Sequence, residues 1–574
     1  MRELTAALVA DGQVPSSLAL APDGRRVAYV VADELWLAGV GLAPRALCTG
    51  GRPRWSADGE SIFFLSGGQL HRRSGDVAEP LTAWPGGIED HVPLADGRRV
   101  ALIARDSTRR DDPWVWSENT RPARLRILDL TSREVATPDA PADVIEVCER
   151  PGGGPLALLT SPAPEDIGAI HVLTEDAVEY LGPAGIDASS LIWWEGDDGW
   201  HVAFLAKPAL VGGCAVFDLG PDGARRDLTY GATVCPVELV PGPLVLVAAG
   251  LDTAVCLLDL TEVARMAGHA ESLTASGDTF AAVVSTRYEP KNVYIGHTKV
   301  TDHRPELREI EWGVQERLSY RASDGLDLDG LLIRPTTGTA PFPLITVPHG
   351  GPYGRFADRL MLDWVPFGQW LATWGYAVFL PNPRGSQGHG HAFAARVAGA
   401  VGREEWTDIL TGLDLLIDDG IADPGRLAIA GWSHGGYLAA WAVARSDRFK
   451  AALVGAGISD WGMLAATGEW GPFEAALGGS AGWEGPGPHP HDRGSPISYA
   501  ADIRTPVLIV HGARDTNVPV SQAEFLHRAL RRFGVEHEYV VYPREGHAIR
   551  ERDHRIDLLH RTRAWFDRWL KPPD

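Results

Sequence analysis

Residues 426–441 read RLAIAGWSHGGYLAAW, and this stretch decides the fold of the C-terminal half. A short apolar run of strand length ends at Ala430, and an Ala/Leu-rich segment typical of a helix start begins at Tyr437. A serine between strand and helix lies on a strained turn, which is tolerated here because the residues two positions to either side are glycines. The turn lifts the hydroxyl above the sheet and leaves the backbone N–H of His434 free to face an oxyanion. We therefore predict that Ser433 is a nucleophile.

The same G-x-S-x-G pattern occurs a second time, at residues 478–482 around Ser480. That copy lies in LGGSAGWEGPGPHPHDRGSP, which has no strand before it and no helix after it. A turn-rich composition explains its glycines. We interpret Ser480 as a loop residue, whereas Ser433 has the context that the chemistry requires; the alternative for Ser433 is an ordinary tight turn of a parallel sheet.

Length and charge narrow the class of protein. With 574 residues the chain exceeds the size of one core, so two or more domains are expected. A hydrophobic content of 45% and a charged content of 22% are typical of globular proteins. The net charge of -22 argues against nucleic acid or an anionic membrane as a partner. No apolar run approaches the length of about 20 residues that a membrane span needs, and the first residues do not resemble a secretory signal.

The cysteines indicate neither a disulfide framework nor a zinc site. There are five, an odd number, widely scattered and without a C-x-x-C pair, and all of them lie in the N-terminal half. We therefore expect a cytoplasmic protein without a metal or other cofactor. Homo-oligomerisation is possible, and the sequence leaves it open.

The N-terminal half repeats one phrase, an apolar strand, a D-G turn and a second apolar strand. It appears as LALAPDGRRVAYVV, PRWSADGESIFFLS and HVPLADGRRVALIA, with the turn aspartates at positions 23, 58 and 96. This pattern is typical of a β-hairpin. A period of 35 to 38 residues suits one four-stranded propeller blade per repeat.

We predict an all-β propeller of about seven blades, with six or eight allowed because the middle repeats are degenerate. A pair of β-sandwiches is the alternative, since turn spacing also fits sandwiches. Most of the tryptophans in this half are expected to pack between blades. The DDPWVW segment at 111–116 lies in a long insertion, which makes it a candidate for a loop that reaches the other domain or the substrate.

Around Glu316 the pattern changes to an alternation of strands and helices. PLITVPHGG, YAVFLPNPRGS, AALVGAG, PVLIVHGARD and EYVVYPREGH are apolar strands that end in turn residues, and segments such as WTDILTGLDLLIDDG show helical periodicity. Such an alternation predicts a doubly wound, mostly parallel sheet of the α/β-hydrolase type. Active sites of these sheets gather at the carboxyl ends of the strands.

A serine nucleophile needs a base, and the base needs a carboxylate to hold its tautomer. In this fold class the chain order is Ser, acid, His. Asp515 ends one strand and His547 ends a later one, both in the required order after Ser433. We predict that these two complete the triad; the alternatives are a turn-capping aspartate and a solvent-facing loop histidine. Asp460 is the second choice for the acid.

Two further expectations concern the surroundings of the serine. The HGGPYG segment (349–354) ends an earlier strand, and its paired glycines let the backbone approach a substrate carbonyl. Gly350 or Gly351 would then supply the second oxyanion N–H, and the alternative is a glycine-rich turn without that role. The His-x-His-Asp run at 489–492 is a weak candidate for a metal site, because no H-E-x-x-H accompanies it.

These motifs together resemble the prolyl oligopeptidase family of serine peptidases. HGGPYG, NPRGSQGHG, GWSHGGYLAAW, HGARDTNVP and EGH follow one another as in that family, and HGGP is most similar to the acylaminoacyl-peptidase branch. The resemblance implies that Gly351 and His434 form the oxyanion hole, and that Tyr353, Trp461 and Val518 lie near the apolar pocket for the residue before the cleaved bond. Asn517 stands where many members carry an arginine that holds a substrate carbonyl, and a neutral side chain offers a weaker, non-ionic hydrogen bond.

We therefore expect a propeller at residues 1–313 and a catalytic domain at 314–574, with the first ten residues or so as a candidate segment for packing on the hydrolase. The predicted function is hydrolysis of short peptides from or near the N-terminus through an acyl-enzyme, with a short peptide or peptide-like compound as the partner. One alternative is an esterase or amidase for small peptide-like or N-acyl compounds. The other is a non-catalytic propeller protein that binds peptides.

Overall fold

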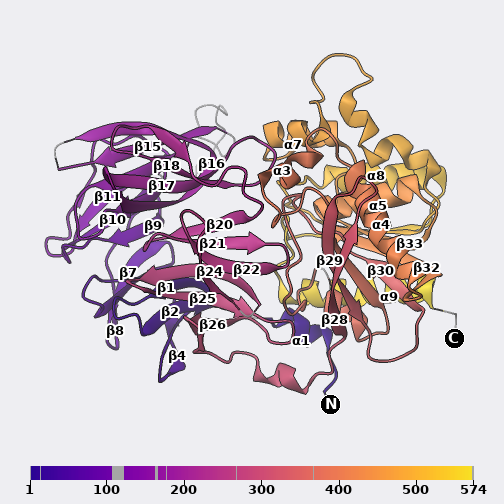
Figure 1. The fold of residues 1–574 in the computed structure, drawn as a ribbon, viewed down its shortest axis with the longest axis horizontal. Helices are drawn as coiled ribbons and strands as arrows, with labels where there is room; N and C mark the ends of the chain where they lie inside the picture. Colours follow the sequence, from indigo (N-terminus) through magenta and orange to yellow (C-terminus); the bar gives the residue numbers. More distant parts are fainter. Residues whose placement is uncertain are drawn as a thin grey trace.

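A computed structural model describes residues 2–571, with the exception of residues 13, 107–121, 162–165, 176, 267 and 366. Figure 1 shows two halves side by side, β-sheets of the N-terminal half (indigo to magenta) and a helix-covered sheet of the C-terminal half (orange to yellow). The DDPWVW segment that the sequence singles out, 111–116, lies outside the described residues.

The N-terminal half is a series of antiparallel sheets, each built from consecutive strands. The first four-stranded sheet contains β1 (Ser16–Leu20), β2 (Arg26–Val31), β3 (Glu34–Gly39) and β4 (Leu42–Thr49). The second contains β5 (Gly51–Trp55), β6 (Ser61–Ser66), β7 (Gln69–Ser74) and β8 (Val77–Pro80). The third contains β9 (Ile88–Pro93), β10 (Arg99–Arg105), β11 (Ala123–Asp129) and β12 (Val135–Ala136). Another four-stranded sheet contains β20 (Cys235–Val240), β21 (Leu244–Ala249), β22 (Asp252–Leu257) and β23 (Glu262–Arg265). The last contains β24 (His269–Ser276), β25 (Thr279–Ser285), β26 (Asn292–Ile295) and β27 (Thr298–Lys299).

A seven-stranded sheet lies between these two groups. Its strands are β13 (Val144–Glu149), β14 (Leu156–Thr160), β15 (Ile167–Leu173), β16 (Val178–Gly196), β17 (Gly199–Lys207), β18 (Ala215–Leu219) and β19 (Arg225–Asp227). The 19-residue strand β16 pairs with β15 through its first part, up to Ile186, and its later residues, from Ser189 to Gly196, pair with β17. The long strand therefore belongs to two four-stranded units, and the described residues of this half contain seven such units.

The repeated D-G phrase has a local cause. In each copy one carboxylate oxygen of the aspartate accepts the backbone N–H two residues later, at 2.8 to 3.0 Å, for Asp23, Asp58 and Asp96. The glycine that follows each aspartate has a φ of 65°, 73° or 67°, which a residue with a Cβ adopts only with strain. These turns join the first two strands of the first three sheets.

The first sheet is in contact with both the second sheet and the last one. β1 lies against β5 of the second sheet and against β24 and β25 of the last sheet. Leu20, Val27 and Tyr29 share one apolar core with Ala281 and Val293 of the last sheet. Packing therefore continues from the last sheet of this half to the first.

The C-terminal half is built on one eight-stranded sheet in the order β28-β29-β31-β30-β32-β33-β34-β35. The strands are β28 (Val314–Arg321), β29 (Asp327–Arg334), β30 (Phe342–Thr346), β31 (Ala377–Asn382), β32 (Ala422–Trp432), β33 (Phe449–Gly455), β34 (Val507–Gly512) and β35 (His537–Tyr542). The first two are antiparallel to their neighbours, and the pairs from β31 to β35 are parallel. Their carboxyl ends therefore meet at one edge of the sheet.

Helices cover both faces of this sheet. The α-helices are α2 (Gly368–Ala372), α3 (His391–Ala394), α4 (Glu404–Asp418), α5 (His434–Arg445), α6 (Trp461–Thr467), α7 (Gly471–Gly478), α8 (Ser521–Phe533) and α9 (Arg552–Leu570), and the 3₁₀ turns are η2 (Pro305–Glu309), η3 (Ala395–Val397), η4 (Pro490–Arg493) and η5 (Pro496–Asp502). One core joins the sheet to α4, α5 and α8, and the other joins it to α2 and α9. None of the helices in the described part of the chain is long and apolar enough to cross a membrane.

The N-terminal segment packs on the C-terminal half. Helix α1 (Ala6–Ala10) lies against α9, and Leu4, Ala6 and Val9 are buried in the same core as the α9 side chains. Asp11 also forms an ion pair with Arg552 at the start of α9.

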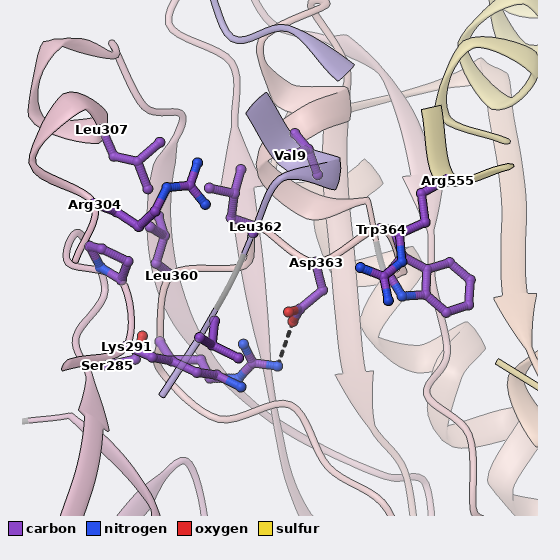
Figure 2. A pocket seen from close by; sticks show the side chains of 14 residues that line it. Val9, Ser285, Lys291, Arg304, Leu307, Leu360, Leu362, Asp363, Trp364 and Arg555 are labelled. Atoms are coloured by element: carbon purple, nitrogen blue, oxygen red, sulfur yellow. Dashed lines mark hydrogen bonds and ion pairs between the residues drawn. The ribbon is translucent and has the colours of Figure 1, made fainter. Parts of the chain in front are cut away.

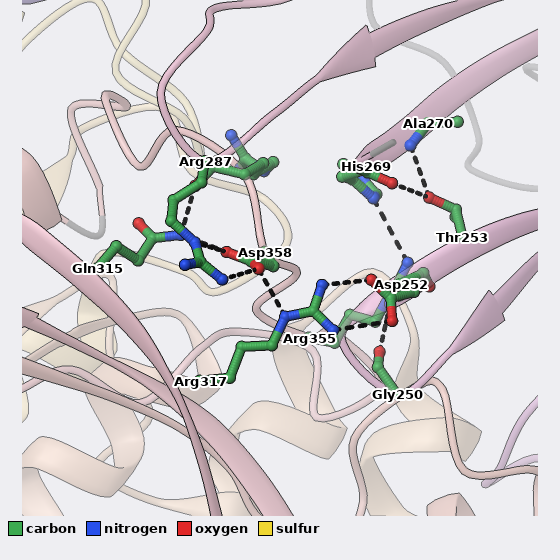
Figure 3. A network of polar contacts seen from close by, with 12 residues as sticks. Gly250, Asp252, Thr253, His269, Ala270, Arg287, Gln315, Arg317, Arg355 and Asp358 are labelled. Atoms are coloured by element: carbon green, nitrogen blue, oxygen red, sulfur yellow. Dashed lines mark hydrogen bonds and ion pairs between the residues drawn. The ribbon is translucent and has the colours of Figure 1, made fainter. Parts of the chain in front are cut away.

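Charged side chains join the two halves in the network of Figure 3. Asp358 is 5% exposed and accepts hydrogen bonds from Arg287 of the N-terminal half, at 2.6 and 3.0 Å, and from Arg317 of β28, at 2.6 Å. Arg317 also donates to Asp252 of β22. Burial raises the pKa of Asp358, but the hydrogen bonds outweigh it and lower the pKa to about 2.

Candidate active site

Ser433 lies between the last residue of β32 and the first residue of α5, as the sequence predicts. Its φ is 60° and its ψ is -122°, a strained conformation for a residue with a side chain. A Cβ at Gly431 would come within 2.1 Å of the Gly435 oxygen, and one at Gly435 within 2.2 Å of the Pro348 oxygen. The glycines are therefore required because strand, turn and helix pass so close to one another.

The predicted acid and base meet at the carboxyl edge of the sheet. Asp515 follows β34 and His547 follows β35, and His547 Nδ1 lies 2.8 Å from Asp515 Oδ2. Asp515 is 5% exposed. Burial raises the pKa of its carboxyl group, but hydrogen bonds from His511 and His547 and from the Val518 N–H outweigh burial and lower the pKa. The carboxylate is thus charged at neutral pH and fixes the His547 tautomer that has its proton on Nδ1.

The base lies beside the turn that carries the serine. The indole N–H of Trp432, the residue before Ser433, donates to the His547 carbonyl at 2.8 Å. Nδ1 of His547 is engaged by Asp515, and within the described residues neither its Nε2 nor the Ser433 hydroxyl has a hydrogen-bond partner. Hydrogen bonds of a catalytic pair are often long or poorly aligned before substrate binds. Both groups are therefore available to each other and to a ligand.

The HGGPYG loop lies against the serine from the other side. A Cβ at Gly350 would lie 3.4 Å from the Ser433 Cβ and 4.0 Å from its Oγ. Gly351 has a φ of 126°, which favours glycine. His434 is the first residue of α5, so its backbone N–H has no acceptor within the helix and points out of the positive end of the helix dipole. The arrangement brings both the loop of Gly350 and Gly351 and the start of helix α5 next to the serine.

His349 holds this loop as a neutral imidazole. Its Nδ1 lies 2.8 Å from the Gly350 oxygen and its Nε2 lies 2.8 Å from the Ser386 hydroxyl. Burial lowers the pKa of His349 to about 4. The ring is therefore uncharged at neutral pH, which leaves the helix end and the N–H groups as the positive features beside Ser433.

The same loop contacts the N-terminal half. Arg355 donates to the carbonyl of Gly250 and, at 2.9 Å, to that of Asp252. The Tyr353 hydroxyl lies so close to Gly213 that a Cβ there would come within 2.4 Å of it. The structure thus places Tyr353, which the resemblance assigned to a substrate pocket, at the contact between the two halves.

The other expected pocket residues surround the catalytic elements. Trp461 is 1% exposed and packs on the His434 and Tyr437 rings, with centroids 5.9 and 5.1 Å apart. Val518 is buried, and its N–H donates to Asp515 Oδ1 at 2.9 Å. Asn517, next to it, is half-buried. The structure brings all three to the site, and their contact with substrate stays a prediction.

Two polar contacts were not predicted from the sequence. His511 is fully buried, donates from Nε2 to the Val518 carbonyl at 2.7 Å, and lies 3.2 Å from Asp515 Oδ2. Its position four residues before Asp515, at the end of a strand, is the sequence signal that could have indicated their proximity. Glu405, from the start of α4, lies 3.1 Å from His434 Nε2. No local pattern connects these two residues, since they meet only through tertiary packing.

Asp460, the second choice for the acid, and Ser480, of the second G-x-S-x-G copy, have structural roles. Asp460 caps α6 by accepting the Met463 N–H at 2.8 Å. Ser480 lies in a bend after α7 and is hydrogen-bonded to His491 Nδ1 at 2.8 Å. The turn-rich interpretation of the second G-x-S-x-G copy agrees with this placement.

A metal is not indicated at the 489–492 run. Among the described residues, potential ligand atoms lie within 4.8 Å of one another at Glu545, Glu551 and His554 instead. The Glu545 oxygens already accept two backbone N–H groups and the His554 ring N–H. These hydrogen bonds account for the cluster without an ion.

A separate cavity of about 70 Å³ lies between α1, the end of the N-terminal half and the C-terminal half (Figure 2). Arg304, Lys291 and Arg555 line it together with Asp363, which pairs with Arg359 at 2.7 Å. Trp364, on its wall, packs edge-to-face on Trp432 with ring centroids 5.0 Å apart. The cavity therefore lies behind the serine turn and not at the serine itself.

A strained serine at a strand–helix turn, with a carboxylate–imidazole pair at the same sheet edge, is the arrangement expected of an α/β-hydrolase site, and it is joined here to a series of antiparallel β-sheets. The family model described as prolyl oligopeptidase family matches residues 367–573 of this chain. The family resemblance inferred from the motifs is thereby confirmed.

Three comparisons give the extent of the similarity. The uncharacterized peptidase YuxL of Bacillus subtilis (strain 168) is 35% identical over 279 residues, 46% of this chain and 40% of that protein. The acylamino-acid-releasing enzyme of Rattus norvegicus is 27% identical over 353 residues, 55% of this chain and 46% of that enzyme. The chain therefore matches less than half the length of these relatives. The solved structure of Pyrococcus horikoshii acylaminoacyl peptidase (uncomplexed) has a TM-score of 0.84 at 21% identity, covering 100% of this chain and 98% of that one, which shows a shared fold.

Proposed function

We propose that this protein is a serine peptidase that hydrolyses short peptides from or near the N-terminus, in the manner of acylaminoacyl peptidases or aminopeptidases. The observation that carries the proposal is the 2.8 Å contact between His547 and Asp515, next to a serine turn whose Trp432 donates to the backbone of the same histidine. The family match over residues 367–573 supports the same chemistry. A carboxylate, an imidazole and a serine in this order serve acyl transfer.

In the proposed mechanism Nε2 of His547 removes the hydroxyl proton of Ser433, and Oγ attacks the carbonyl carbon of the scissile amide. Asp515 holds the ring and stabilises the imidazolium that forms. The N–H groups of Gly351 and His434 bind the oxyanion of the tetrahedral intermediate. His547 then protonates the leaving amine, and a water molecule, deprotonated by the same ring, hydrolyses the acyl-enzyme to restore the serine.

The contacts between the halves support a preference for short substrates. Tyr353 lies in the HGGPYG loop and Arg355 follows it directly, and both contact the N-terminal half. A folded protein cannot enter a site bordered in this way, whereas a short or extended peptide can. We also propose that residues 1–313 form the propeller and 314–574 the catalytic domain, with Trp461, Asn517, Val518 and Tyr353 near the substrate.

The test compares wild type with Ser433→Ala on free aminoacyl-p-nitroanilides, N-acetylated peptides and p-nitrophenyl esters. We expect peptide or anilide turnover by wild type and its loss in Ser433→Ala, together with loss of labelling by a fluorophosphonate probe. Turnover of the esters or small amides alone would favour a small-molecule hydrolase. Retained turnover in Ser433→Ala, or a wild type that neither turns over substrate nor reacts with the probe, would reject the proposal.

A further inference from the structure

Glu545 lies two residues before His547, in the connection between β35 and α9, and is 3% exposed. Its Oε1 accepts the backbone N–H of Glu551 at 2.8 Å and the ring N–H of His554 at 2.7 Å. Its Oε2 accepts the backbone N–H of Arg550 at 2.9 Å. One buried carboxylate therefore closes the connection into a loop, with His547 at its middle.

The backbone of Glu545 ties this loop to the one that carries the acid. The Glu545 carbonyl accepts the N–H of Arg514, the residue before Asp515, at 2.8 Å. The two loops are in close contact there, since a Cβ at Gly512 would lie 2.1 Å from the Gly546 oxygen. The same residue thus contacts both segments whose separation sets the His547–Asp515 distance.

Electrostatics keep this carboxylate charged. Burial raises the pKa of Glu545, but hydrogen bonds from the Arg550 N–H, from His554 and from the Glu551 N–H outweigh burial and lower the pKa. The group also faces the N-terminal end of the 19-residue helix α9, where a negative charge is favourable. His554 has a second neighbour in the Tyr542 ring, at 5.1 Å between centroids, so its own position is fixed.

We propose that Glu545 is a positioning residue for the general base: it holds the loop of residues 545–551 so that the His547 ring stays between Asp515 and Ser433. The inference rests on the proposed function, because it assigns a role in the same reaction. If Glu545 acted only as a cap of helix α9, its replacement would have a different effect on turnover. Loss of a cap lowers the stability of α9 and leaves the turnover of folded molecules unchanged.

The decisive variant is Glu545→Gln, which keeps the size of the side chain but turns an amide NH₂ toward groups that are themselves donors. A displacement of about 1 Å in a catalytic group can cost about 10²-fold in rate. We expect kcat to fall about 10²-fold while KM stays within about twofold, since the oxyanion loop and the N-terminal half are untouched. The rate of fluorophosphonate labelling of Ser433 should fall in parallel, because it also requires His547 as the base.

Asp557→Asn is the matched control. Asp557, an acid of helix α9, accepts the Tyr542 hydroxyl at 2.9 Å, and among the described residues it forms no hydrogen bond or ion pair with the side chains of the 545–551 loop. Both variants are assayed below their own unfolding temperatures, so that only folded protein contributes. The control should keep wild-type kcat and labelling rate, even if its thermal stability falls.

The outcomes separate the two proposals. If wild type is active and Glu545→Gln keeps its kcat and labelling rate, the positioning role is wrong and the proposed function stands. An inactive wild type that does not react with the probe would reject both. Should Glu545→Gln not fold, Glu545→Asp and His554→Gln take its place: a lower kcat at unchanged KM in either supports positioning, and wild-type kcat in both overturns it.

Discussion

Asp515 contacts two imidazole rings, and these contacts explain why its carboxyl group is ionised. His547 contacts Oδ2 at 2.8 Å and His511 contacts the same atom at 3.2 Å, while the Val518 N–H occupies Oδ1. Three donors around one buried carboxylate favour the ionised form over the protonated one. The negative charge is what a proton-accepting His547 needs beside it, because the imidazolium that forms during attack is then paired.

Asp515→Asn is expected to lower kcat about 10⁴-fold, because an amide holds the wrong imidazole tautomer. Steady-state kinetics at neutral pH measure the effect, and thermal unfolding shows whether the fold persists. Asp460→Asn is the matched control, since Asp460 only caps α6 and an amide oxygen can still accept the Met463 N–H. A larger loss in the Asp460 variant than in the Asp515 variant would reverse the assignment of the acid.

The elements around the serine show how far local sequence reaches. The strand–serine–helix turn was predictable because part of its requirement for glycine is local: a Cβ at Gly431 would lie 2.1 Å from the Gly435 oxygen. The D-G hairpins were predictable for the same reason. Strand β16 was not, because its Gly and Pro residues signal turns, yet it continues through irregular pairing around Asp187 and Ser190, both with positive φ. Tertiary contacts such as Glu405 with His434 have no sequence signal at all.

Packing between α5 and β33 gives a prediction at the scale of elements. Gly436 lies in the first turn of α5, and a Cβ there would come within 2.3 Å of the Gly455 oxygen. An exposed helical Gly→Ala change normally stabilises by about 1 kcal/mol. Gly436→Ala should instead destabilise by about 1–3 kcal/mol, since the helix must move off the strand, and the shift of Ser433 should lower kcat.

Thermal unfolding and fluorophosphonate labelling measure both effects of Gly436→Ala. Gly51→Ala is the control, because a Cβ at Gly51 meets nothing within 4 Å and its φ is not positive. Its stability should stay within about 0.5 kcal/mol of wild type. A stabilised Gly436 variant would mean that α5 and β33 are less closely packed than described.

At the scale of the whole molecule, polar contacts join the halves beside the end of the HGGPYG loop. Cys235 of β20 accepts the backbone N–H groups of Gly388 and Gly390 at 3.1 and 3.2 Å, and Gly250 donates to the Gly388 carbonyl at 2.9 Å. Arg355, which follows the HGGPYG loop, donates to the carbonyl of Asp252 at the start of β22. The loop beside Ser433 therefore depends on contacts from the N-terminal half, and a displacement of that half would also disturb the proposed oxyanion site.

Asp358→Asn tests this junction, because it leaves Arg287 and Arg317 facing a neutral side chain (Figure 3). Removing one member of a buried ion pair costs about 3–5 kcal/mol. Here the side chains of Arg287 and Arg317 are 35% and 41% exposed, and Arg317 keeps Asp252, so solvent screening should reduce the loss to about 1–2 kcal/mol. The two halves should then unfold in more clearly separated calorimetric transitions than in wild type.

The pH dependence of stability provides a second test of the same variant. The pKa of Asp358 is about 2 in the folded protein against an ordinary value of 3.8, so the folded state holds fewer protons between these values. The contribution of the charge is fully present above pH 3.8 and is lost as the pH falls toward 2, where the carboxyl group becomes neutral like the amide. The stability difference between wild type and Asp358→Asn should therefore shrink across this interval, as measured by denaturant unfolding at fixed ionic strength. A difference that stays constant down to pH 2 would assign the effect to packing and not to charge.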